Sequence, residues 1–146
     1  MILYLDSSSV VKIYLYQAHV VEKGAKEVRS SVERAERVAA AKITYVETKS
    51  NLARALREKR ILNDKEYHMI VEAFDKDWQS YIVVSLTNRV IRLAGDLAEK
   101  HALKGYDAVQ LASAIELVKR IPVAIGFSSW DNDLLKATEI EGLTIV

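Results

Sequence analysis

The sequence predicts one α/β domain over residues 1–146, built as a mostly parallel β-sheet with helices packed on both faces. Its length of 146 residues fits the usual size of one domain. Short apolar segments alternate along the chain with longer segments of helical periodicity. No internal repeat or Pro/Gly/Ser-rich linker divides the chain. Because short apolar strands joined by helices are typical of buried parallel sheets, we expect a layer of helices on each side.

The composition is that of an ordinary globular protein, with 50% hydrophobic and 28% charged residues. The absence of cysteine excludes a disulfide framework, a thiolate metal site and a cysteine nucleophile. An acid, Asp6, interrupts the N-terminus before an apolar signal segment forms, and no apolar run approaches the roughly 18 residues of a membrane span. We therefore expect a soluble protein of the cytoplasm.

The first part of the chain predicts a strand, two helices and a second strand. The apolar run Ile2–Leu5 predicts a buried strand, and apolar residues at helical spacing predict a helix over residues 7–16. A more polar helix is expected over residues 21–37. A short apolar run over residues 38–41 predicts the second strand.

Two capping signals open the next helices. Thr44 and Glu47 have the form of a capping box before a helix over residues 44–60, and Asn63 with Glu66 repeats the signal. The second of these helices carries an apolar stripe that predicts either core packing or a subunit interface. The stripe consists of Tyr67, Ile70, Val71, Phe74 and Trp78.

The remaining residues predict three strands and three helices. Residues rich in β-branched side chains predict a strand over 81–86, followed by a helix over 87–101. After a break at residues 104–106, the most apolar helix of the chain begins at Asp107. Strands over 123–127 and 143–146 flank a short helix over 131–137, which Ser128 and Ser129 are expected to cap.

Four acidic residues stand at predicted strand ends or helix starts: Asp6, Glu47, Asp107 and Asp131. Taken singly, each is explained as a helix cap or as a partner of a helix dipole. Ligands of open α/β sheets, however, bind beyond the carboxyl ends of the strands. Four carboxylates gathered there would repel one another unless they were protonated or bridged by a cation. A ligand set made only of oxygen suits Mg²⁺ or Mn²⁺ better than Zn²⁺, and such an ion can assist phosphodiester cleavage.

The charge distribution offers a basic rim for a nucleic acid. The net charge is only +1, but residues 19–60 hold 11 Lys and Arg against 6 Asp and Glu.

Other kinds of active site have no support in the sequence. The three histidines are scattered without an HExxH pattern, and the phosphate-loop, dinucleotide and nucleophile-elbow motifs are absent. A receiver domain would need tandem acids after the first strand, where Asp6 stands alone.

Four segments, in this order, resemble the PIN-domain family and specifically its VapC-type toxins: Leu5–Lys12, Ile43–Glu47, His101–Ala114 and Ser129–Leu135. The resemblance implies a three-layer α/β/α sandwich and a Mg²⁺- or Mn²⁺-dependent ribonuclease. The implied catalytic acids are Asp6, Glu47, Asp107 and Asp131.

The same resemblance implies supporting residues and partners. Ser7 and Ser129 would support the site through their hydroxyls, although threonine is commoner at the position of Ser129. Asp133 could join or replace Asp131 as the fourth acid. Members of this family are typically dimers, neutralised by a small VapB-type antitoxin whose tail occupies the acidic groove.

The leading hypothesis is therefore a toxin ribonuclease that cleaves RNA, with Asp6 and Asp107 as the main metal ligands and Glu47 and Asp131 completing the site or positioning water. A catalytically silent RNA- or protein-binding module that keeps a structural cation site is the alternative. In a third interpretation the acids only cap helices, and Mg²⁺ then has no effect on the melting temperature.

Overall fold

The computed structural model describes residues 1–146. The chain folds into five strands, which are β1 (Ile2–Leu5), β2 (Arg37–Ala41), β3 (Ile82–Val84), β4 (Ile125–Ser128) and β5 (Thr144–Ile145). The helices are α1 (Ser7–Gln17), α2 (Ala25–Arg34), α3 (Thr44–Arg57), α4 (Asp64–Trp78), α5 (Asn88–His101), α6 (Gly105–Arg120) and α7 (Asn132–Ile140). No helix is long and apolar enough to cross a bilayer.

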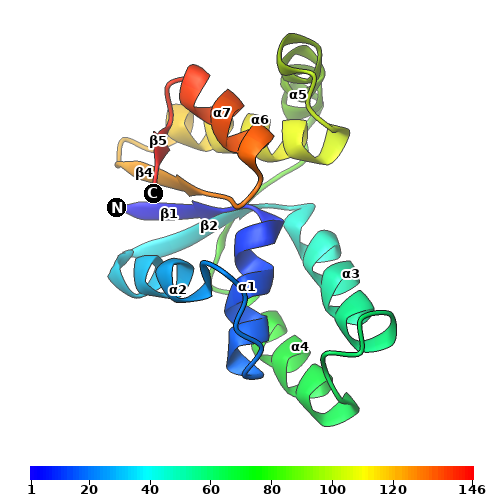
Figure 1. Ribbon diagram of the computed structural model, residues 1–146. Helices are drawn as coiled ribbons and strands as arrows, with labels where there is room; N and C mark the ends of the chain where they lie inside the picture. Colours follow the sequence, from blue (N-terminus) through cyan, green and yellow to red (C-terminus); the bar gives the residue numbers. More distant parts are fainter.

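The five strands form one parallel sheet in the order β3-β2-β1-β4-β5. The chain moves outward from β1 through β2 to β3, then returns to the other side of β1 to add β4 and β5. Because crossovers between parallel strands are right-handed, this reversal places the connecting helices on opposite faces. Helices α1–α4 cover one face and α5–α7 the other, as Figure 1 shows. The predicted three-layer α/β/α sandwich is confirmed.

Each face of the sheet has its own hydrophobic core, and the central strand β1 contributes to both. Ile2 and Tyr4 enter the core beneath α5–α7, whereas Leu3 and Leu5 enter the core beneath α1–α4. This alternation follows from the two-residue period of a strand. Tyr4 is fully buried and stacks on Phe127 of β4, with ring centroids 5.3 Å apart. The strand that ends at the predicted site is therefore held rigidly on both sides.

Several predicted boundaries are wrong. The expected helix over residues 21–37 is shorter, because α2 begins after Gly24, whose left-handed backbone (φ 84°) turns the chain, and ends before β2 starts at Arg37. The apolar helix begins at Gly105 rather than at Asp107. Strand β4 spans Ile125–Ser128, two residues later at its start than expected.

Of the three capping predictions, one is confirmed and two are wrong. The capping box of Asn63 and Glu66 is confirmed by hydrogen bonds in both directions, of 2.8 and 3.0 Å. The box of Thr44 and Glu47 is wrong, since α3 has no side-chain cap and Thr44 is fully buried. The prediction that Ser128 and Ser129 cap the short helix after β4 is also wrong, because the N-cap of that helix, α7, is Asp131.

The apolar stripe of α4 packs within the chain. Ile70 and Phe74 are fully buried in the core beneath α1–α4. Tyr67, Val71 and Trp78 are half-buried against the same core. Of the two interpretations of this stripe, core packing accounts for all five side chains.

Candidate active site

The predicted site lies where the strand order reverses, between β1 and β4. Asp6 directly follows β1, and Ser129 directly follows β4. The Ser129 hydroxyl donates a hydrogen bond of 2.6 Å to Asp6 Oδ2, which joins the two strand ends across the reversal. In open α/β sheets this reversal leaves a crevice at the carboxyl edge, where ligands bind.

Asp6 is a buried carboxylate with three hydrogen-bond donors. Its side chain is 3% exposed, and Oδ1 accepts from the backbone N–H of Ser9 at 3.0 Å and from the Ser8 hydroxyl at 2.7 Å. The bond from Ser9 makes Asp6 the N-cap of α1, as expected for an acid in this position. Burial nevertheless raises the pKa of Asp6, repulsion from Asp131 adds to the increase, and the three hydrogen bonds oppose it.

Glu47 is oriented by a buried residue that sequence reasoning missed. Gln110 is 1% exposed, and its Nε2 donates to Glu47 Oε1 at 2.9 Å and to the Thr44 hydroxyl at 2.8 Å. The Tyr4 hydroxyl lies 2.9 Å from Gln110 Oε1 and donates to it, so the amide oxygen faces Tyr4 and the amide nitrogen faces the Glu47 carboxylate. Burial raises the pKa of Glu47, while the hydrogen bonds from Gln110 and Ser7 lower it. The predicted supporting residue Ser7 thus lies beside Glu47.

Asp107 interacts electrostatically with all three of the other acids. It lies in the first turn of α6 and is half-buried. Burial and the neighbouring charges of Asp131, Asp6 and Glu47 together raise the pKa of Asp107 to about 6, and only Lys104 acts in the opposite direction. These mutual effects show that the fold brings the four predicted acids into one electrostatic cluster.

Asp131 has two roles in the structure. Its Oδ1 accepts a hydrogen bond of 2.9 Å from the backbone N–H of Leu134, which caps α7. Its charge also raises the pKa values of Asp6 and Asp107. Asp133 is exposed in the first turn of α7 and is not among the groups that raise these pKa values. The electrostatic coupling therefore involves Asp131.

The cluster contains no positive partner of its own. None of the ion pairs in the structure includes any of the four acids. No group of three or more Asp, Glu, His or Cys side chains is arranged to hold a metal ion as it stands. A smaller direct set still fits Mg²⁺, which commonly uses one or two carboxylates and keeps several waters. The donor set therefore suits a hard divalent cation bound by two carboxylates and solvent.

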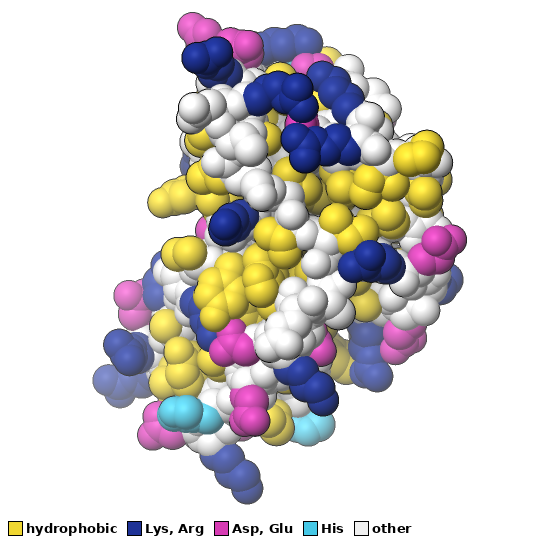
Figure 2. All heavy atoms as spheres, turned by 180° about the vertical axis from the view of Figure 1, so that it is seen from behind, with side chains coloured by type: hydrophobic (Ala, Val, Ile, Leu, Met, Phe, Trp, Pro, Cys, Tyr) yellow, Lys and Arg dark blue, Asp and Glu magenta, His cyan; other side chains and the backbone are white.

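The basic residues of the segment 19–60 reach the site only in part. Lys26 and Arg34 of α2 line a hollow of about 720 Å³ together with Ser129 and Trp130. Lys104, the cation that acts on Asp107, lies outside that segment. On the face seen in Figure 2, Lys and Arg side chains gather at the upper end of the molecule, and others are scattered among hydrophobic, acidic and polar side chains. Of the basic residues 19–60, Lys26 and Arg34 therefore line a hollow that Ser129 also lines.

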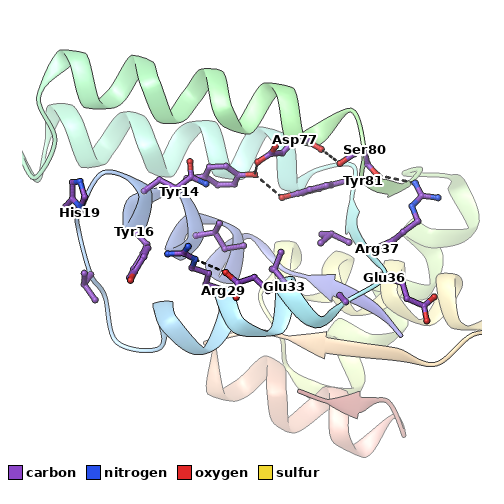
Figure 3. Close-up of a pocket in the computed structure, with 16 residues that line it drawn as sticks. Tyr14, Tyr16, His19, Arg29, Glu33, Glu36, Arg37, Asp77, Ser80 and Tyr81 are labelled. Carbon is purple, nitrogen blue, oxygen red and sulfur yellow. Dashed lines mark hydrogen bonds and ion pairs between the residues drawn. The ribbon is translucent and has the colours of Figure 1, made fainter.

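A hollow of about 970 Å³ lies away from the acidic site. It lies near the amino ends of the strands, against Arg37 at the start of β2, and Figure 3 shows the side chains that line it. Its charged groups have partners: Asp77 accepts from the Tyr14 hydroxyl at 2.8 Å, and Arg29 pairs with Glu33 at 3.1 Å. Because the acids whose charges raise the pKa of Asp107 lie at the carboxyl edge and form no ion pair, that edge is the candidate active site.

The fold, with its strand reversal between β1 and β4, is that of a PIN-like α/β/α sandwich. No protein-family model matches the chain. Two proteins of Mycobacterium tuberculosis, Ribonuclease VapC45 (strain CDC 1551 / Oshkosh) and Ribonuclease VapC49 (strain ATCC 25618 / H37Rv), are each 30% identical to it over 118 residues. In both cases the match covers 78% of this chain and 75% of the relative. The chain therefore belongs to the VapC ribonuclease family.

Solved structures support the fold. FitAcB from Neisseria gonorrhoeae matches with a TM-score of 0.64 and 15% identity, covering 99% of this chain and 96% of that one. VapBC-1 from nontypeable Haemophilus influenzae matches with a TM-score of 0.64 and 16% identity, covering 100% and 97%. At such low identity these matches show the fold alone.

Proposed function

We propose that this protein is a Mg²⁺- or Mn²⁺-dependent endoribonuclease and the toxin of a toxin–antitoxin pair. The observation that carries the proposal is the cluster of Asp6, Glu47, Asp107 and Asp131, in which the charges of the other three acids raise the pKa of Asp107 and none of the four acids forms an ion pair. Such a cluster is costly in the metal-free protein and becomes favourable when a cation binds. Membership in a family whose relatives are named ribonucleases supports the same conclusion.

The four acids would have different roles in the reaction. Asp6 and Asp107 would hold the cation, since Asp6 is buried at the end of β1 and its charge, with those of Asp131 and Glu47, raises the pKa of Asp107 in the first turn of α6. A bound divalent cation supplies positive charge against the phosphodiester and lowers the pKa of water at the site.

Glu47 and Asp131 complete the site. Gln110 holds the Glu47 carboxylate in one orientation, so that its second oxygen can position the water that attacks phosphorus in line with the leaving oxygen. Asp131 is held by its cap on α7. The Ser129 hydroxyl donates to Asp6, and Ser7, which lowers the pKa of Glu47, would help to keep that carboxylate in place.

The partner of the toxin would be a small VapB-type antitoxin. Solved structures that share this fold include the VapBC-1 complex, and FitAB bound to a DNA fragment. Carboxylates without a counter-ion attract an arginine side chain, because its guanidinium can bind a carboxylate through two parallel hydrogen bonds. We propose that a basic residue of the antitoxin enters the acidic cluster and that the toxin forms a homodimer.

Cleavage of RNA by the purified protein tests the proposal. We expect cleavage with Mg²⁺ or Mn²⁺, none with EDTA, and none for Asp6→Asn or Asp107→Asn variants that remain folded. Asp96→Asn, which removes an exposed acid of α5, is the matched control and should cleave like the wild type. Cleavage that persists in both site variants would identify a contaminating nuclease. A protein that binds Mg²⁺ and RNA but never cleaves would instead support the silent binding module.

A further inference from the structure

Two aromatic side chains of this protein are exposed, and each comes directly before one of the four clustered acids in the sequence. The chain has 7 Tyr, 2 Trp and 2 Phe residues, and only Tyr106 and Trp130 are exposed, at 68% and 40%. Tyr106 directly precedes Asp107, and Trp130 directly precedes Asp131. Single exposed apolar residues are common on protein surfaces, but here each exposed aromatic residue is the sequence neighbour of one of the four clustered acids.

Trp130 is held in a fixed position next to Asp6. Its backbone N–H donates at 3.0 Å to the Ser8 hydroxyl, which itself donates to Asp6. The indole packs so closely on Gly24 that a Cβ atom there would lie 2.2 Å from the ring. The ammonium of Lys12 lies over the ring, 5.2 Å from its centroid. The exposed part of the indole borders the hollow of about 720 Å³ that Ser129 also lines.

Tyr106 lies in the first turn of α6, one residue from the acid with the strongly raised pKa. Its neighbour Lys104 is exposed and forms no ion pair. Lys26 and Arg34, which line the hollow beside Trp130, likewise form no ion pair with an acid. Each ring is therefore accompanied by a positive charge that is available to a phosphate.

We propose that Tyr106 and Trp130 are base-stacking platforms beside the scissile phosphate, and that each ring stacks on an unpaired base next to the cut. This inference rests on the proposed ribonuclease function. Aromatic faces with nearby Lys or Arg are the usual means of binding unpaired bases, whereas paired bases in a helix have no free face to offer. The unpaired cations favour a polyanion over a protein as the ligand of these rings.

The test compares ring-deleting with ring-keeping variants. The probe is a fluorescein–quencher single-stranded oligoribonucleotide, with copies that carry an abasic site on either side of the mapped cut. Tyr106→Ala and Trp130→Ala should each raise KM about 5- to 150-fold with kcat nearly unchanged, since stacking contributes to ground-state and transition-state binding alike. Tyr106→Phe and Trp130→Phe should restore KM. Val118→Ala, which trims an exposed apolar residue at the far end of α6, is the matched control and should change nothing.

Two comparisons make the result specific to stacking. The abasic oligonucleotides should bind the wild type as weakly as the intact probe binds the alanine variants, and annealing the probe into a duplex should abolish cleavage. Unchanged KM in both alanine variants, or equal cleavage of the duplex, would overturn the inference while leaving the ribonuclease intact.

A measurement without cleavage separates the two proposals. In an Asp107→Asn background, single-stranded oligoribonucleotides that carry 2-aminopurine at successive positions should lose fluorescence on binding, and Tyr106→Ala or Trp130→Ala should weaken that binding. If the wild type never cleaves but this quenching depends on the rings, the ribonuclease proposal is wrong and the stacking of bases on the two rings is supported. If the quenching is the same without the rings, the platforms fail.

Discussion

Replacing Asp107 by Asn should stabilise the metal-free protein, because the substitution removes a charge that the fold disfavours. Burial and the charges of Asp131, Asp6 and Glu47 raise the pKa of Asp107 to about 6. The difference from the ordinary value of 3.8 corresponds to about 3 kcal/mol. Asp107 is only half-buried and solvent screens part of this repulsion, so we expect a gain of ~1 kcal/mol in the free energy of unfolding. For a domain of this size that is about 3–5 °C in Tm.

The gain should depend on pH in a defined direction. Because the pKa of Asp107 is higher in the folded than in the unfolded state, folding is penalised above about pH 6, where the carboxylate is ionised. The penalty falls as the pH decreases through about 6 and disappears below about 4, where both states are protonated. Asn has no such titration. The advantage of Asp107→Asn should therefore be full near neutral pH and absent in acid.

Urea unfolding in EDTA, followed by circular dichroism at about pH 7.5 and about pH 4, measures both effects. Asp96→Asn serves as the control because Asp96 is an exposed acid of α5, and it should change the free energy of unfolding by less than about 0.5 kcal/mol. An Asp107→Asn variant that is no more stable than the wild type at neutral pH would refute the argument that the acids repel one another.

Three other predictions follow from the contacts. Gly24→Ala should lower the free energy of unfolding by about 1–3 kcal/mol, because the new Cβ would clash with Trp130 and the backbone at Gly24 is left-handed. Gly95→Ala on α5 has open space around the new Cβ and should raise the free energy of unfolding by about 0.5–1 kcal/mol. Thermal melts of the two variants and the wild type measure both changes. Gln110→Met should lower stability by about 1–3 kcal/mol and reduce cleavage, because it leaves buried hydrogen-bonding groups unpaired and frees Glu47 to turn; urea unfolding and kcat measure the two effects. Mg²⁺ should raise the Tm of the wild type in proportion to the logarithm of its concentration above Kd, and a Tm that ignores Mg²⁺ would favour the helix-cap interpretation.

The order of helices and strands could be predicted from the sequence, because each short apolar run and each helical stripe carries its own period. The strand at Ile2–Leu5 and the helix that carries Ile70 and Phe74 could be predicted for this reason. Boundaries failed where a local signal competed with tertiary contacts. Thr44 has the residue type of an N-cap, yet it is buried and accepts a hydrogen bond from Gln110 instead.

The site was predicted through its acids but not through the residues that orient them. Four carboxylates at strand ends and helix starts were visible in the sequence, whereas their convergence depends on the return of the chain from β3 to β4 beside β1, which no local period encodes. Gln110 had one available signal: it is a polar residue three positions after Asp107 in the most apolar helix, and such a residue lies on the same face. Its partner Tyr4 lies 106 residues away and could not be paired with it from the sequence.

Titration of the purified protein with Mn²⁺, followed by electron paramagnetic resonance of the free ion, tests most directly whether the acids form one cation site. The wild type should bind Mn²⁺, and Asp6→Asn and Asp107→Asn should each weaken binding by at least about tenfold, because both carboxylates contribute to the same site. Equal Mn²⁺ binding by the wild type and both variants would contradict the account.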